Sequence, residues 1–171
     1  RMSADLVEWP PFYTLQPVAA TRNKQLAAWA DIVSAWAGTQ SEQLVSATSP
    51  VFTNTKISRN FSPDACAVLF AHLVESGRAI WPAAGRTDSV LILSKPLGVL
   101  ADAISAWVAD GGRAGTVATI AELCENEADA PLRGLDVRVG VAAALALESQ
   151  GAATCMRDGA AVVGVKFAGV S

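Results

Sequence analysis

Residues 62–77 read SPDACAVLFAHLVESG and decide the fold class, because they define one helix with a clear start and stop. Ser62 suits the N-cap, Pro63 the first helical position, and Asp64 the positive end of the helix dipole. Gly77 ends the helix after a stripe of apolar residues at helical spacing. The stripe consists of Cys66, Leu69, Phe70 and Leu73.

The segments on either side of this helix complete a winged-helix outline. Thr21 suits the N-cap of an earlier amphipathic helix that ends at Gly38, and residues 49–50 can start one short helical turn. Two β-prone runs, at residues 79–81 and 89–93, follow the quoted helix and predict a hairpin. Helices followed by a hairpin are typical of a winged helix.

The same order of elements repeats in the C-terminal half of the chain. The pattern predicts a helix that ends at residues 111–112, a β-prone pair, a short helix, a longer helix over residues 135–150 and a second hairpin. Residues 73–77 and 147–151 occupy equivalent places, each just before a hairpin. We therefore expect an α+β, mostly helical fold with two tandem winged-helix domains. The expected division is an extended N-terminal arm over residues 1–20, domain 1 over 21–95 and domain 2 over 96–171.

The expected arm contains the sequence WPPFYTLQP at residues 9–17. Proline fixes its own φ and pushes the preceding residue toward extended geometry, so a regular helix is not expected to begin here. A stiff segment loses little entropy on docking, and Phe12 or Tyr13 can fill a partner's pocket. Two alternatives remain: the arm folds back on its own domain, or the Pro-Pro-x-Tyr sequence is a ligand for a WW domain.

The sequence offers no constellation of catalytic or metal-binding residues. His72 is the only histidine and lies off the apolar stripe of its helix. The three cysteines are widely separated and lack metal-ligand spacing, and the loop at residues 111–115 lacks the Lys-Ser/Thr of a phosphate-binding loop. The acids between residues 122 and 129 are typical of a solvated face. We therefore predict a protein that is not an enzyme and needs no metal or cofactor.

The charge distribution disfavours nucleic-acid binding, which is the main alternative function for a winged helix. The formal net charge is −3 over 171 residues. The first candidate recognition helix, residues 63–76, contains Asp64 and Glu75 but no Lys or Arg. Because phosphate neutralisation by basic side chains supplies most of the affinity for DNA, weakly charged helices suit protein partners better.

No stretch of the sequence is long and apolar enough to predict a transmembrane helix. The longest apolar run, residues 139–147, is far too short to span a bilayer. The first residues also lack the succession of basic, apolar and small residues of a secretory signal. We therefore expect a cytosolic protein.

The N-terminal sequence is similar to that of a known family. The string PPFYTLQP, followed by Thr21-Arg22 and the sequence KQLAAW at residues 24–29, resembles the vacuolar protein sorting-associated protein 25 family of ESCRT-II subunits. Shorter matches continue along nearly the whole chain. They are residues 49–52, Trp107-Val108, Gly134-Leu135-Asp136 and residues 164–167.

The resemblance implies a non-catalytic adaptor in multivesicular body sorting of ubiquitinated cargo. In that family the Pro-Pro-x-aromatic segment docks on the core subunits numbered 22 and 36, which implies that Pro10, Pro11, Phe12 and Tyr13 form the docking site here. The family's second domain recruits the ESCRT-III subunit numbered 20, and Leu135 and Asp136 are the candidate contacts. The chain is then expected to reach endosomal membranes through its partners, and the isolated chain to be capable of self-association.

Overall fold

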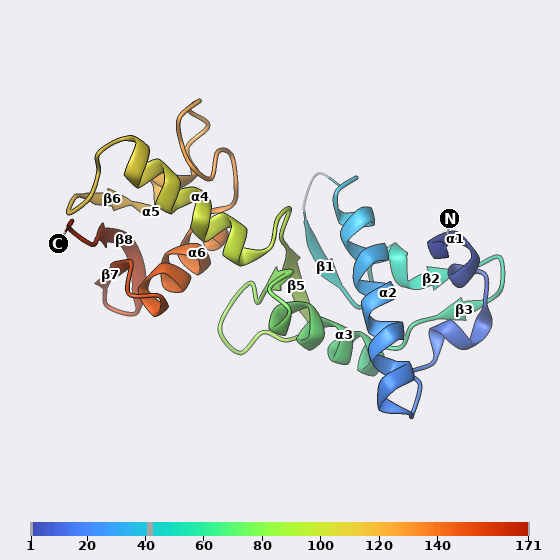
Figure 1. The fold of residues 1–171 in the computed structure, drawn as a ribbon. Coiled ribbons are helices and arrows are strands. Elements are labelled where there is room, and N and C mark those ends of the chain that lie inside the picture. The colour runs from blue at the N-terminus through green and yellow to red at the C-terminus, as the bar shows by residue number, and fades with distance from the viewer. Residues whose placement is uncertain (1, 41–42, 171) are drawn as a thin grey trace. The chain divides into compact units, whose positions relative to one another are not determined.

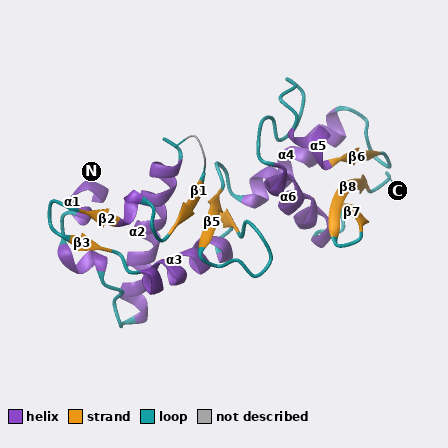
Figure 2. Ribbon diagram, turned by 180° about the vertical axis from the view of Figure 1, so that it is seen from behind, coloured by secondary structure: helices purple, strands orange, loops and turns teal. Residues whose placement is uncertain are grey.

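The computed structural model describes residues 2–40 and 43–170, and the chain divides into two compact units, Arg1–Ser94 and Lys95–Ser171 (Figure 1). Small antiparallel sheets accompany the helices in both units (Figure 2). The fold is α+β and mostly helical, with two tandem winged-helix domains, as the sequence predicts. Within the described residues, no helix has both the length and the apolar character to cross a membrane.

The first unit contains the helices α2 and α3 and a three-stranded sheet of order β1-β5-β4 (Figure 1). In this sheet Val45 pairs with Val90 and Ala79 pairs with Ile92. A separate two-stranded ribbon, β2-β3, pairs Thr53 with Asn60. The elements are α1 Met2–Val7, η1 Pro10–Tyr13, α2 Ala19–Ala37, β1 Leu44–Ser46, η2 Pro50–Phe52, β2 Thr53–Asn54, β3 Arg59–Asn60, α3 Pro63–Glu75, β4 Ala79–Ile80 and β5 Ser89–Ile92.

Helix α3 has the start and stop that its sequence predicts. The Ser62 hydroxyl accepts a hydrogen bond from the Ala65 backbone N–H at 3.1 Å, and Pro63 is the first helical residue. Gly77 follows the helix with a φ of 73°, a left-handed conformation that glycine adopts without strain. The four residues of the predicted apolar stripe are buried. The N-cap predicted for α2 is wrong, because the helix starts at Ala19 and Thr21 lies inside its first turn.

Over residues 95–170 the second unit shows the winged-helix order of three helices and three strands. Its sheet has the order β6-β8-β7, with Ala118 opposite Val165 and Cys155 opposite Val165 on the other side. Thr119 and Glu122 form a capping box at the start of α5. The elements are α4 Leu97–Asp110, β6 Val117–Thr119, α5 Ile120–Cys124, α6 Val137–Ser149, β7 Ala153–Asp158 and β8 Ala161–Phe167.

Helices α5 and α6 approach closely at Gly140. A Cβ atom at this position would lie 2.6 Å from the Cys124 Sγ atom and 2.9 Å from the Ile120 Cγ2 atom. The absence of a side chain therefore allows the two helices to pack at this distance. At the other end of α6, Glu148 accepts hydrogen bonds from the Cys155 N–H at 2.9 Å and the Arg157 guanidinium at 2.7 Å, which fixes the helix to the hairpin.

The N-terminal segment differs from the extended arm that the sequence predicts. Residues 2–7 form the helix α1, and residues 10–13 form the 3-10 turn η1. Phe12 and Tyr13 are buried in the hydrophobic core of the first unit. The physical reason is that a proline φ fits a 3-10 turn as well as an extended segment, and burial of two aromatic rings favours the turn. The alternative of a segment folded back on its own domain therefore describes this structure.

Candidate protein-binding surfaces

The aromatic pair of the N-terminal segment packs against the indole of Trp29, which lies at the centre of the first unit's core. The Phe12 ring stacks on Trp29 with a centroid distance of 4.7 Å and an interplanar angle of 7°. The Tyr13 ring meets the same indole edge-on at 5.4 Å. Phe61 stacks on Trp29 at 4.7 Å, and Phe52 lies at 5.8 Å. Trp29 thus joins the N-terminal segment to the aromatic residues around η2 and β3.

Helix α2 also binds the backbone of this segment through two side chains. The Phe12 carbonyl accepts hydrogen bonds from Trp29 Nε1 at 3.0 Å and from Gln25 Nε2 at 2.9 Å. Gln25 further donates to the Thr14 carbonyl at 2.8 Å and accepts from the Gln16 N–H at 3.1 Å. Gln25 is buried, so these bonds satisfy polar groups that would otherwise be desolvated without partners. The segment is therefore held by its backbone as well as by its rings.

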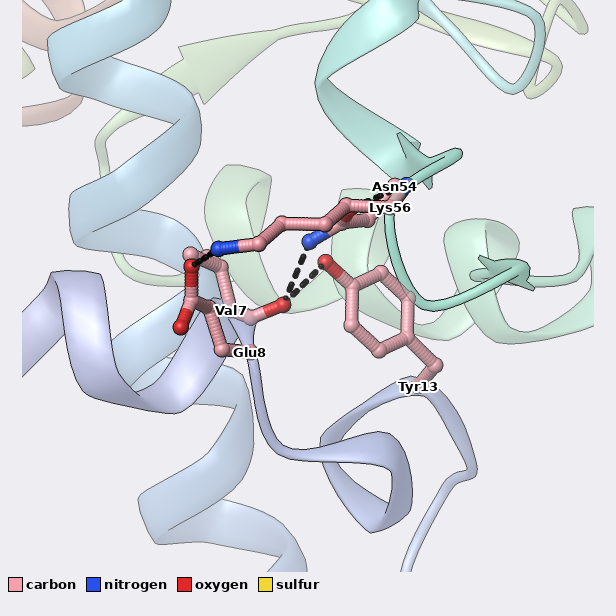
Figure 3. Close-up of polar contacts among 5 residues, drawn as sticks. All are labelled: Val7, Glu8, Tyr13, Asn54 and Lys56. Carbon is pink, nitrogen blue, oxygen red and sulfur yellow. Dashed lines mark hydrogen bonds and ion pairs between the residues drawn. The ribbon is translucent and has the colours of Figure 1, made fainter.

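A second set of polar contacts connects α1 to the ribbon β2-β3 (Figure 3). The Val7 carbonyl accepts hydrogen bonds from the Tyr13 hydroxyl at 3.0 Å and from Asn54 Nδ2 at 2.8 Å. Lys56 and Glu8 form an exposed ion pair at the edge of the same group. Burial raises the pKa of Tyr13, so the hydroxyl stays protonated and continues to donate at neutral pH.

The outer side of the segment is apolar and open to solvent. Trp9 is 53% exposed, and Pro10 and Pro11 are also exposed. We call Trp9, Pro10 and Pro11 the Trp-Pro-Pro surface. The four predicted docking residues therefore separate into two roles: the prolines are accessible, while Phe12 and Tyr13 are 3% and 5% exposed and fix the turn from within.

The burial of Tyr13 also bears on the WW-domain alternative. A Pro-Pro-x-Tyr ligand presents its tyrosine ring to an aromatic groove in an extended conformation. Here the ring lies against Trp29, the hydroxyl is bonded to Val7, and the prolines belong to a 3-10 turn. Binding in that manner would require the whole segment to leave its domain.

The two predicted ESCRT-III contacts lie at the start of α6 in the second unit. Leu135 is half-buried, and Asp136 is exposed as the N-cap of the helix. The Asp136 carboxylate accepts from the Arg138 N–H at 2.8 Å and pairs with the Arg138 guanidinium at 2.9 Å. The hydrogen bond from the Arg138 side chain lowers the pKa of Asp136. Asp136 thus has a clear structural role in starting the helix.

A catalytic or metal site would be expected to draw on the histidine and the three cysteines. His72 is half-buried on α3, and all three cysteines are buried. Burial raises the pKa of the Cys66 thiol to about 12, which disfavours the nucleophilic thiolate. Among the described residues, no group of three or more His, Cys, Asp and Glu side chains is arranged so that it could hold a metal ion.

The helices that a DNA-binding winged helix would use carry little positive charge. Helix α3 contains Asp64 and Glu75 and no Lys or Arg, and the Arg138 of α6 is paired with Asp136.

An open pocket in the second unit is also acidic: it is lined by Trp107, Arg113 and four carboxylates. The sequence analysis predicts a solvated face for those acids and does not identify Trp107 and Arg113 as their neighbours. The one clue in the sequence is the position of Arg113 directly after the Gly111-Gly112 helix stop.

These features define a class: a tandem winged-helix protein with an exposed apolar surface on its N-terminal segment. The model of the ESCRT-II complex subunit family matches residues 6–135. The chain therefore belongs to the family of ESCRT-II complex subunits, which confirms the resemblance found in its N-terminal sequence.

Known proteins are similar to this chain over most of its length. The vacuolar protein-sorting-associated protein 25 of Danio rerio is 34% identical over 125 residues, which are 70% of each chain. The Arabidopsis thaliana protein of that name is 30% identical over 93% of this chain and 91% of its own. The crystal structure of subunit VPS25 of the endosomal trafficking complex ESCRT-II superposes with a TM-score of 0.70 at 26% identity, covering 92% of this chain and 94% of that one.

Proposed function

We propose that this chain is a non-catalytic adaptor that docks on an ESCRT-II core through its N-terminal segment and first domain, and recruits ESCRT-III through its second domain. The observation that carries the first part is the Trp-Pro-Pro surface, which exposes three apolar side chains on a turn that is already rigid. A relative of the same fold occurs in the crystal structure of the endosomal complex ESCRT-II (VPS22/VPS25/VPS36). The proposed core partners are proteins of the VPS22 and VPS36 type.

Rigidity supports this docking role. Hydrogen bonds from Gln25 and Trp29 hold the turn, and Phe12 and Tyr13 fill the core beneath it. Association then costs little conformational entropy in this segment, because its backbone is already ordered. Trp and Pro side chains at the surface offer contact area without long flexible chains, and Trp is enriched among residues that dominate binding energy. In this proposal Pro10 and Pro11 contact the partner, while Phe12 and Tyr13 position them.

The docking proposal is tested by changing the exposed residues alone. Trp9→Ala combined with Pro11→Ala is expected to abolish co-elution with purified VPS22- and VPS36-type subunits in size-exclusion chromatography. Val18→Ala, which alters another exposed apolar residue of the first unit, is the matched control and should leave co-elution intact. Undiminished co-elution of the double variant, with an unchanged circular dichroism spectrum, would contradict the docking role.

Substitutions of the buried residues Phe12 and Tyr13 would not distinguish loss of docking from loss of folding. Phe12→Ala with Tyr13→Ala would remove two core rings and their stacking on Trp29. Loss of binding by that variant would then reflect unfolding of the first unit as readily as loss of contacts. The exposed residues separate these causes.

The proposed recruitment of an ESCRT-III subunit of the VPS20 type concerns the start of α6. Leu135 is half-buried and Asp136 is exposed there, next to an exposed Val137. Leu135→Ala with Val137→Ala is expected to weaken binding of that subunit, measured by isothermal titration calorimetry, without changing docking on the core. Equal affinity of the variant and the parent chain would exclude this end of α6 from the interface. Localisation at endosomal membranes is proposed to follow from these partners.

A further inference from the structure

Strand β7 is the longest edge strand among the described residues. It runs over six residues, Ala153–Asp158, whereas every other described edge strand has three residues or fewer. Backbone N–H and C=O groups on the outer side of an edge strand lack a neighbouring strand, so a long edge can pair with a strand of another chain. The outer side of β7 is therefore where strand addition to this chain is expected, unless other groups cover it.

The backbone of Cys155 points to this outer side. The Ala152 carbonyl accepts a hydrogen bond from the Ala168 N–H at 3.0 Å, on the side of β8. Because successive residues of a strand direct their backbone groups to opposite sides, Thr154 faces β8 and Cys155 faces the free edge. Pairing with β8 is regular up to Met156, where a bulge follows. Cys155 therefore lies in the regular part of the edge, at which a further strand could pair.

Two side chains bind both backbone groups of Cys155. Its N–H donates to Glu148 Oε1 at 2.9 Å, and its carbonyl accepts from Arg157 Nη1 at 3.1 Å. The two side chains also bind each other, with Arg157 Nη2 at 2.7 Å from Glu148 Oε2. In an antiparallel sheet the opposite residue of a neighbouring strand would supply the same two bonds, one from an acceptor and one from a donor. The ion pair therefore takes the place of a partner strand at this residue.

An incoming strand would have to displace this ion pair. The bonds to Cys155 and between the two side chains involve charged groups, which makes them stronger than the neutral backbone bonds that would replace them. The Arg157 and Glu148 side chains are 44% and 30% exposed, so their charges lie at the surface that such a strand would approach. Because both groups belong to the chain itself, they bind Cys155 without the entropic cost of association.

The opposite edge of the same sheet, β6, is covered in a similar way. The Thr116 carbonyl accepts a hydrogen bond from the Phe167 N–H on the side of β8, so Thr119, three residues later, points outward. Its N–H donates to Glu122 Oε2 at 2.6 Å, as part of the capping box of α5. Each edge of this sheet thus has a carboxylate bound to an outward N–H group.

We propose that the Glu148–Arg157 ion pair closes the β7 edge to strand addition, and that a chain without it associates with a second copy through antiparallel pairing of their β7 strands. A second copy is the expected partner because a two-fold axis places a strand antiparallel to itself, so that one sequence supplies both sides. The exposed residues Thr154 and Met156 carry no charge that would oppose this pairing. The inference concerns self-association and does not rest on docking to ESCRT-II or ESCRT-III subunits.

The test measures self-association of the full chain by analytical ultracentrifugation over a range of concentrations. Glu148→Ala with Arg157→Ala is expected to lower the dissociation constant of the dimer at least about tenfold relative to the parent chain. Arg86→Ala with Asp88→Ala is the matched control, because it removes another exposed ion pair and leaves the net charge the same. This control should associate no more than the parent chain.

A second set of variants separates strand pairing from association through unfolding. Thr154→Lys with Met156→Lys, added to the Glu148→Ala and Arg157→Ala chain, places like charges on both strands of the pair and should restore the parent's dissociation constant. Both positions are exposed, so the fold should tolerate the lysines. Lysines at residues 105 and 109, exposed positions of α4, add the same charge away from β7 and should leave the dimer in place.

Two results would overturn the proposal. One is a chain lacking the ion pair that keeps the parent's circular dichroism spectrum and associates no more strongly than the parent. The other is association that the two sets of lysines reduce equally, or that neither set reduces, since it would then not pass through β7.

Discussion

Phe12 illustrates, at the scale of a single residue, how the N-terminal segment contributes to stability. Its ring is 3% exposed and stacks on Trp29, while its carbonyl accepts two hydrogen bonds. Phe12→Ala is expected to lower the free energy of unfolding by about 3–5 kcal/mol, the usual cost of removing a buried phenylalanine ring. Urea unfolding followed by circular dichroism measures this. Trp9→Ala, three residues earlier and exposed, should change the value by less than about 0.5 kcal/mol.

Gln25 makes a separate contribution through its buried amide. Gln25→Leu keeps the approximate volume but leaves the Gln16 N–H without its acceptor, and it removes one of the two hydrogen bonds to the Thr14 carbonyl. The expected loss is about 1–3 kcal/mol, because buried polar groups without hydrogen bonds are costly. Gln40→Leu, at an exposed position, is the control for the substitution itself. If both variants unfolded at the same urea concentration as the parent chain, Gln25 would not stabilise the segment.

Glu148 should make part of the stability depend on pH. Hydrogen bonds from the Arg157 guanidinium, and then from the Cys155 N–H, hold the pKa of Glu148 at about 2, below its ordinary value of 4.5. A carboxyl with a depressed folded pKa stabilises the fold above its unfolded pKa, and that contribution is lost as the pH falls from about 4.5 to about 2. Glu148→Gln should therefore unfold at a lower temperature than the parent chain at pH 7.

The difference between the two melting temperatures should shrink as the pH falls through that window, since the parent carboxyl becomes neutral as well. Glu75→Gln, on exposed helix surface, is the control and should show no such convergence. A constant difference between Glu148→Gln and the parent chain across the whole range would show that the charge of Glu148 does not stabilise the hairpin.

At the scale of the helices and strands, a glycine-to-alanine substitution is expected to have opposite effects on stability at two positions. Gly140→Ala would place a Cβ 2.6 Å from Cys124 Sγ, so α5 and α6 must separate, at an expected cost of about 1–3 kcal/mol. Gly98 in α4 has nothing within 4 Å of the corresponding position. Gly98→Ala should therefore stabilise the domain by about 0.5–1 kcal/mol, because it reduces the entropy of the unfolded chain. Thermal unfolding shows whether each variant is less or more stable than the parent chain.

The elements that the sequence predicts well are those with local determinants. Ser62 and Pro63 start α3, Thr119 starts α5, and both predicted hairpins are present. The three-residue strand β1 and the ribbon β2-β3 were missed, because their pairing depends on distant partners and their own pattern is too short to identify. Ser49-Pro50 was predicted to start one short turn, and η2 is that turn.

The N-terminal segment shows the limit of the local argument most clearly. Two consecutive prolines restrict φ but allow either a 3-10 turn or an extended chain. The choice depends on Trp29 and Gln25, which lie 17 and 13 residues from Phe12 in the sequence. Likewise, the acids between Glu122 and Asp129 gain a neighbouring aromatic wall only when α4 and β6 pack in the same domain. Pattern and composition identify these residues, whereas tertiary contacts decide what they do.

At the scale of the whole molecule, the second unit has its own helices, sheet and buried side chains. Residues 95–171 are therefore expected to fold when produced alone, and to retain a cooperative thermal transition in circular dichroism. As a comparison, Gly140→Ala should lower the melting temperature of the fragment, as it is expected to do in the full chain. A fragment with a broad, noncooperative transition would show that the second unit depends on the first for its folding.

The position of Trp29 has a practical consequence for how the first domain may be trimmed. A truncated chain that starts at residue 21 would lack Phe12 and Tyr13, so the face of the Trp29 indole that they cover would be exposed to water. An exposed apolar surface of this kind promotes aggregation. Limited proteolysis should accordingly spare residues 10–16 in the intact chain, and any preparation lacking them should need detergent or a fusion partner to stay in solution.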